Sequence, residues 1–141
     1  MDNALNIWSL FDSILGEYAV RIKSHLSSLS LSMVDYKILH LVHSEPKNMK
    51  YLADTLSLAK GWVTDITDGL EERNLVKRVH SSQDRRVINI EITDEGLKIY
   101  NKVGKMIKTI IGDSISSLPE DDVEKLSTIL EKISQNMHCH S

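Results

Sequence analysis

The spacing of apolar residues departs from a helical period in only one region of this chain, and that departure limits the folds open to it. Over residues 5–29 apolar side chains recur every three or four positions, which is the period of one face of an α-helix. Over residues 75–92 the pattern becomes that of two β-strands, with strict alternation at 88–92. The helical period then returns and continues almost to the end. We therefore expect a mainly α-helical (α+β) protein that contains one small β-hairpin.

Helix caps divide the middle of the chain into short elements. Ser32 followed by Asp35 is a variant of the capping box and marks the start of a second helix. Asn48 caps a short third helix, and a fourth helix is expected at about 59–73. Two short helices joined by about three residues make a helix-turn-helix, and a hairpin that follows directly is a wing. Residues 32–92 are thus predicted to form a winged helix-turn-helix.

Long amphipathic helices are expected at both ends of the chain. Thr93 caps a fifth helix, and Pro119 suits the first position of a sixth. The compact middle can cover only part of the apolar stripes on these helices. A second copy of the chain would cover the rest, so residues 1–31 and 93–141 are predicted to be the dimerisation region of a single domain spanning 1–141. One intramolecular three-helix cluster is the alternative.

Composition excludes several other classes of protein. With 141 residues, of which 41% are hydrophobic, the chain has no apolar run of the roughly 18 residues that a membrane span needs. Its N-terminus lacks the basic start of a signal peptide, so we expect a cytoplasmic protein with no membrane partner. No Gly-rich phosphate loop, paired catalytic carboxylates or nucleophile elbow is visible. We therefore expect no enzymatic activity and no cofactor.

The end of the chain, His138-Cys139-His140, is the only feature that favours a metal-dependent enzyme. Imidazole and thiolate groups bind soft metals, but a closed zinc site needs about four ligands. Three adjacent residues rarely give a defined geometry, so we expect an irregular tail and no metal site. Cys139 is the only cysteine, which excludes an intramolecular disulfide.

Positive charge is concentrated in the region of the hairpin. The net charge is −3, but between residues 73 and 90 five basic residues stand against a single acid. A short basic stretch between acidic helices indicates a localised phosphate-binding element. The basic residues are Arg73, Lys77, Arg78, Arg85 and Arg86.

The outward side of the fourth helix offers groups suited to a DNA major groove. Its residues are Lys60, Gly61, Trp62, Thr64 and Asp65. Lys60 can reach a phosphate or a guanine edge, Thr64 can bond a base or a phosphate, and Gly61 allows close approach. Asp65 can accept from a cytosine amino group but also repels phosphate. An ordinary solvated helix face is the alternative interpretation.

The hairpin tip carries the tripeptide Asp84-Arg85-Arg86. An arginine at such a tip can enter the minor groove, where the potential is most negative over A·T-rich sequence. Asp84 is placed to orient the Arg86 guanidinium by a bidentate pair, and Arg85 would then face a phosphate. A polar turn with a surface ion pair worth under about 1 kcal/mol is the alternative.

Three runs together resemble the MarR (multiple antibiotic resistance regulator) family: residues 70–78, Asp84-Arg85-Arg86, and residues 90–96. The resemblance implies a transcription regulator that binds double-stranded DNA sequence-specifically, and we expect it to be a repressor. It also implies a homodimer whose first and last two helices interlock on a palindromic operator, with half-sites roughly 10 bp apart. The chain departs from the family pattern at Asp65, where a basic residue is common, and carries a further acid at Asp68. A winged-helix protein-interaction module without specific DNA binding is therefore the alternative function.

The resemblance also suggests an effector, because many members of the family respond to small aromatic anions. A pocket for such a ligand would need a cation beside aromatic rings, near the junction of the dimerisation and DNA-binding regions. The first two helices offer Tyr18, Arg21, His25, Tyr36 and His40. The alternative is that these side chains only border the hydrophobic core.

Overall fold

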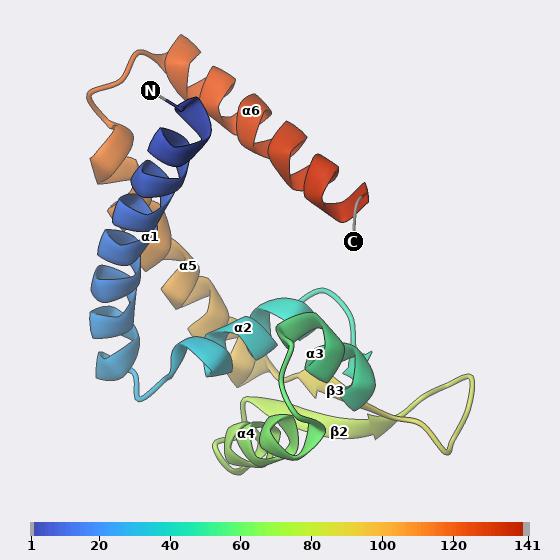
Figure 1. Ribbon diagram of the computed structural model, residues 1–141. Helices are drawn as coiled ribbons and strands as arrows, with labels where there is room; N and C mark the ends of the chain where they lie inside the picture. The colour runs from blue at the N-terminus through green and yellow to red at the C-terminus, as the bar shows by residue number, and fades with distance from the viewer. Residues whose placement is uncertain (1, 140–141) are drawn as a thin grey trace. The chain divides into compact units, whose positions relative to one another are not determined.

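The structure, a computed structural model, describes residues 2–139, which form six α-helices and three short β-strands (Figure 1). The predicted fold class, mainly α-helical with a hairpin wing, is confirmed. The chain divides into two compact units, Met1–Ile107 and Lys108–Ser141, which are described separately. No helix among the described residues is both long and apolar enough to cross a lipid bilayer.

The first unit begins with two helices whose ends are set by side-chain caps. Helix α1 (Asn3–Ser28) starts where the Ala4 amide donates to Asp2 Oδ1 at 3.0 Å. Helix α2 (Met33–Val42) has the full capping box: Asp35 N donates to Ser32 Oγ at 3.0 Å, and Ser32 N donates to Asp35 Oδ2 at 2.9 Å. These bonds satisfy amide groups that the helix itself leaves unpaired.

The helix-turn-helix follows as α3 (Met49–Leu56) and α4 (Lys60–Glu72). Asn48 caps α3 as predicted, accepting from Tyr51 N at 2.8 Å. The turn between the helices passes through Ser57, which adopts the left-handed conformation with φ 54°. Helix α4 buries Val63, Leu70 and also Thr67, whose hydroxyl donates to Val63 O at 2.6 Å.

The wing is part of a three-stranded antiparallel sheet in the order β1-β3-β2. Strands β2 (Val76–His80) and β3 (Ile88–Ile92) form the predicted hairpin, with Val76 opposite Ile92. Strand β1 (Lys47–Asn48) was not predicted, because two residues are too few to show a period. It ties the start of α3 to the hairpin.

The core of the first unit joins the helix-turn-helix to the hairpin. Ile38, Leu52, Leu70, Ile90 and Val103 are fully buried in one cluster that draws on α2, α3, α4, β3 and α5 (Asp94–Ile115). Burying an aliphatic side chain contributes about 1.5–3 kcal/mol. This shared core therefore fixes α4 and the wing in one rigid arrangement.

The start of α5 packs tightly against Asn74 and Leu75, in the segment that follows α4. Thr93 Oγ1 donates to Asn74 O at 2.6 Å and accepts from Gly96 N at 3.0 Å, which confirms Thr93 as the cap. A Cβ atom on Gly96 would lie 2.0 Å from the carbonyl oxygen of Leu75. Only glycine fits at this position without a backbone shift.

The second unit contains the end of α5 and all of α6 (Glu120–Cys139), which Pro119 precedes directly. Helix α6 has no buried residue, and its exposed apolar side chains are Leu126, Ile129, Leu130, Ile133 and Met137. The helix continues through His138 and Cys139, so the expected irregular tail is wrong for these two residues; His140 lies outside the described residues. Within the described chain no group of three metal-ligating side chains occurs.

Candidate nucleic-acid interface

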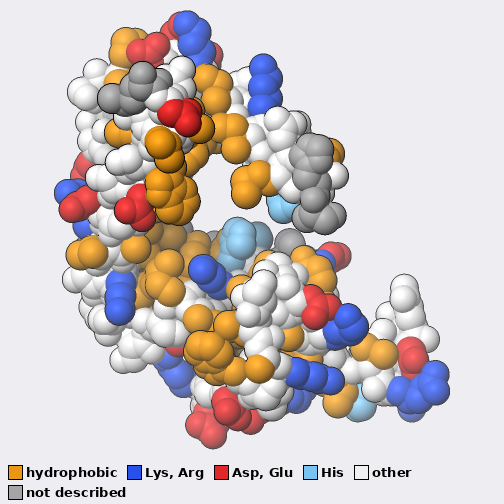
Figure 2. Space-filling view, in the orientation of Figure 1, with side chains coloured by type: hydrophobic (Ala, Val, Ile, Leu, Met, Phe, Trp, Pro, Cys, Tyr) orange, Lys and Arg blue, Asp and Glu red, His pale blue; other side chains and the backbone are white. Residues whose placement is uncertain are grey.

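The tip of the wing is ordered by its own hydrogen bonds. Ser81 N donates to Val87 O at 2.9 Å, and Val87 N donates to Asp84 O at 3.0 Å. His80 Nδ1 lies 2.9 Å from the carbonyl oxygen of Arg85. The loop between β2 and β3 thus has a defined shape, and Figure 2 shows basic side chains gathered at its end.

Asp84 holds Arg86 in the way the sequence predicted. Its Oδ1 accepts from Arg86 N at 3.0 Å and from Arg86 Nε at 3.2 Å, while Oδ2 accepts from Nη2 at 3.3 Å. These side-chain and backbone hydrogen bonds from Arg86 lower the pKa of Asp84. The Arg86 side chain is 92% exposed, so the oriented guanidinium is fully accessible to a partner.

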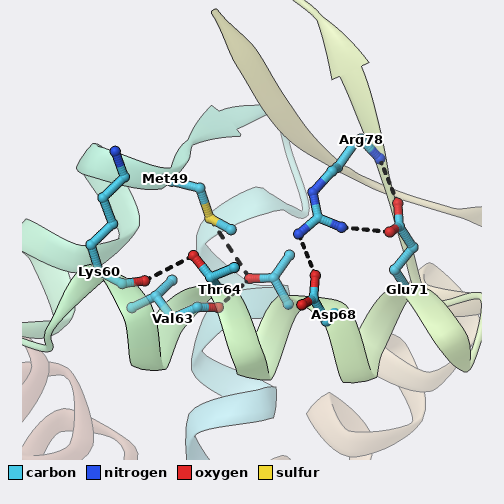
Figure 3. A network of polar contacts seen from close by, with 8 residues as sticks. Met49, Lys60, Val63, Thr64, Asp68, Glu71 and Arg78 are labelled. Carbon is cyan, nitrogen blue, oxygen red and sulfur yellow. Dashed lines mark hydrogen bonds and ion pairs between the residues drawn. The ribbon is translucent and has the colours of Figure 1, made fainter.

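Arg78, by contrast, is bound within the protein. From strand β2 it donates through Nη2 to Asp68 Oδ1 and through Nη1 to Glu71 Oε1, each at 2.5 Å (Figure 3). The Arg78 amide also donates to Glu71 Oε2 at 3.2 Å, and the two carboxylates, Asp68 first, raise the pKa of the guanidinium. We call Arg78, Asp68 and Glu71 the α4–β2 clasp. Asp68, which the sequence showed as a further acid on this helix, is therefore paired with a cation.

Arg73 also has a structural partner. Its guanidinium donates to Ser30 O at 2.7 Å and to Leu29 O at 2.9 Å, which are carbonyl groups in the turn after α1. Two of the five basic residues of the hairpin region are thus used to hold the fold together. Lys77, Arg85 and Arg86 remain exposed.

The predicted reading residues lie together on the first two turns of α4. Lys60, Gly61, Trp62 and Asp65 are exposed, and Trp62 is 54% exposed despite its large apolar ring. Thr64 is half-buried and donates its hydroxyl to Lys60 O at 2.9 Å (Figure 3). Its oxygen can then act only as an acceptor toward a partner unless this bond breaks.

The proposed effector residues are only partly brought together. Tyr36 and His40 lie in a cluster with His43 and Tyr100, in which His40 Nδ1 is 2.7 Å from the Tyr100 hydroxyl and the His43 and Tyr100 rings are 4.5 Å apart. Burial, and then the neighbouring Tyr100, raises the pKa of Tyr36.

The remaining effector candidates all lie on α1. Arg21 and His25 are exposed, and Tyr18 is half-buried. The sequence did not identify His43 and Tyr100, because both repeat at helical spacing with apolar residues and so looked like core positions. The cluster joins α2 to α5 and brings together two of the expected effector residues, Tyr36 and His40.

A helix-turn-helix whose second helix is clasped to a basic, preoriented wing defines a winged-helix DNA-binding protein. Residues 31–88 match the model of the MarR family. Together with the relatives and solved structures below, this match supports a DNA-binding, winged-helix transcription regulator of the MarR type. The family is one of regulators rather than enzymes.

Two curated relatives come from Bacillus subtilis (strain 168). The HTH-type transcriptional regulator MhqR is 29% identical over 113 residues, which cover 79% of this chain and 78% of MhqR. The HTH-type transcriptional repressor MdtR is 33% identical over 84 residues, which cover 60% of this chain and 54% of MdtR.

Two solved structures extend the similarity to nearly the full chain. The transcriptional regulator BldR from Sulfolobus solfataricus is 28% identical with a TM-score of 0.79, covering 96% of both chains. CouR from Rhodococcus jostii RHA1, solved with p-coumaroyl-CoA bound, is 25% identical with a TM-score of 0.75, covering 90% of both chains.

Proposed function

We propose that this protein is a transcription repressor that binds a palindromic operator as a homodimer. In each half-site α4 enters the major groove and the wing, residues 80–87, enters the minor groove. Residues 32–92 form the DNA-binding region, and residues 1–31 and 93–141 form the dimer. The repressor assignment is supported by the similarity to MdtR, which is named as one.

The observation that carries the proposal is the Asp84–Arg86 pair at the tip of the wing. An arginine side chain carries about 2 kcal/mol of rotamer entropy, part of which is lost when a bound state fixes it. Asp84 fixes the guanidinium before DNA arrives and so reduces that loss. The α4–β2 clasp and the common core hold α4 and the wing at a constant spacing, as simultaneous contact with two grooves requires.

The homodimer is supported by the apolar side chains that the single chain leaves exposed. On α1 these include Leu5, Trp8, Leu10, Leu15 and Val20, and α6 carries a comparable set. Exposed apolar surface on this scale is typical of protein–protein interfaces. A two-fold dimer also matches the symmetry of a palindromic operator.

The proposal is tested by selecting operators from random duplexes and then measuring affinity by fluorescence anisotropy as salt is varied. We expect enrichment of a palindrome, an affinity that falls steeply with salt, and a loss of about tenfold or more for Arg86→Ala. Lys98→Ala, which removes one cation from α5, is the matched control and should bind as the wild type does. Unchanged affinity for Arg86→Ala would contradict the role of the wing. Failure to enrich any duplex would favour the protein-interaction module instead.

We further propose that a small aromatic anion releases the operator by binding beside Tyr36 and His40, with Tyr18, Arg21 and His25 completing the pocket. The support is the ring cluster between α2 and α5 and the p-coumaroyl-CoA bound to CouR. A panel of hydroxybenzoates, titrated against the protein–operator complex, should release DNA from the wild type. Tyr36→Ala should bind DNA normally and lose the response.

A further inference from the structure

The acids of α4 fall into two groups according to their partners. Asp68 and Glu71 are neutralised by Arg78 in the α4–β2 clasp. Asp65, one turn closer to the start of the helix, is exposed, and within residues 2–139 the structure gives its carboxylate no hydrogen bond or ion pair. No contact among the described residues therefore accounts for a carboxylate on this outward side of α4.

Gly61 lies one helical turn before Asp65 on the same face. Glycine inside a helix is less favourable than alanine by about 1 kcal/mol. A Cβ atom on Gly61 would meet nothing within 4 Å, so packing in the chain does not require the glycine. The missing side chain does, however, let another molecule approach the backbone closely. The short side chain of Asp65 needs such an approach to reach a base edge.

We infer that Asp65 selects a cytosine at one position in each half of the operator. An ionised carboxylate can only accept hydrogen bonds, so it needs a donor on the base edge. In the major groove, guanine and thymine present acceptors, and adenine presents its amino donor beside the N7 acceptor. Cytosine presents the N4 amino donor with no acceptor on its own major-groove edge, which makes it the base best suited to donate to a carboxylate.

This assignment rests on the proposed function. In it, Asp65 acts as much by weakening binding to the wrong bases as by binding cytosine. A carboxylate among phosphates is unfavourable unless it has a donor, so Asp65 weakens binding wherever cytosine is missing. The clasp removes the similar repulsion that Asp68 and Glu71 would exert at every sequence. Specificity therefore comes from the single acid in the first half of α4 that is left unneutralised.

The test repeats the random-duplex selection with wild type, Asp65→Ala, Asp65→Asn and the control Glu72→Gln. Glu72 is exposed at the far end of the same helix, so this control removes one charge without touching the reading end. We expect the wild type to enrich cytosine at one position per half-site. Asp65→Ala should lose the preference at that position alone, Asp65→Asn should move it toward adenine, and Glu72→Gln should keep the wild-type motif.

Affinity measurements on single duplexes complete the test. Changing the selected C·G pair to T·A should weaken wild-type binding about tenfold, which is within the range for one mismatched base pair. The same change should weaken the binding of Asp65→Ala by less than about twofold. If wild type and Asp65→Ala enrich the same base at every position, the inference is overturned although the proposed function stands. If the wild type enriches no duplex at all, it is the proposed function that fails.

Discussion

Three arginines near the hairpin carry the same charge and have three different roles. Arg73 binds backbone carbonyl groups, Arg78 binds two carboxylates of α4, and Arg86 is presented to solvent by Asp84. The role of each depends on whether its partner is a neighbour in sequence or in space. Only Asp84–Arg86, two residues apart, was within reach of sequence reasoning.

The Asp84–Arg86 pair gives the first prediction at the residue scale. Arg86 lowers the pKa of Asp84 through hydrogen bonds that only the ionised carboxylate accepts well. The pair is therefore intact at neutral pH and is lost as the pH falls through the lowered pKa. An NMR titration of the Asp84 side chain should have its midpoint below the usual aspartate range, and Arg86→Ala should move the midpoint upward. Equal midpoints in the two proteins would show that the pair is not formed in solution.

Gly61→Ala separates folding from DNA binding at a single residue. A methyl group at this position meets open space, and alanine favours a helix over glycine by about 1 kcal/mol. The variant should be more stable to urea by up to that amount, yet should bind the operator more weakly because its backbone is held further from the bases. Gly69→Ala, also in open space on α4, should be stabilised similarly and bind normally. Equal or stronger DNA binding by Gly61→Ala would remove the need for close approach.

At the scale of elements, the order of helices and the hairpin could be predicted because their signals are local. Ser32 with Asp35, Asn48 and Thr93 each form the cap that the sequence indicated. Strand β1 and the clasp could not be predicted in this way. Lys47 pairs with Ile90, and Arg78 meets Asp68, only after the core has brought their elements together.

The junction between the hairpin and α5 gives a prediction for an element boundary. A methyl group on Gly96 would overlap the Leu75 carbonyl oxygen at 2.0 Å, and because that atom is backbone it cannot move aside cheaply. Overpacking of this kind costs about 1–3 kcal/mol. Gly96→Ala should therefore lower the urea midpoint clearly, whereas Gly104→Ala, which meets open space later in the same helix, should not. If Gly96→Ala had the same urea midpoint as the wild type, the backbone at this junction would have to shift without a cost in stability.

At the scale of the whole molecule, the two described units have one property in common, which is apolar surface without a partner in the chain. On α1, Trp8 is 68% exposed, and on α6, Met137 is 69% exposed. The sequence predicted the helical stripes correctly, but no pattern within one chain can show what covers them. We propose that a second copy of the protein covers them, which makes oligomeric state the property to measure.

Trp8→Glu tests the dimer and its link to DNA binding together. Burying an unpaired carboxylate in place of an indole ring would cost several kcal/mol per subunit, so sedimentation equilibrium should show a shift from dimer to monomer. Ile88→Glu, on a wing-strand residue that is 44% exposed, adds the same charge and should remain dimeric. Each Trp8→Glu subunit keeps α4 and the wing intact, because its core lies elsewhere in the unit. Its affinity for the full palindrome should therefore fall to that of a single half-site, and a Trp8→Glu protein that stays dimeric would exclude α1 from the interface.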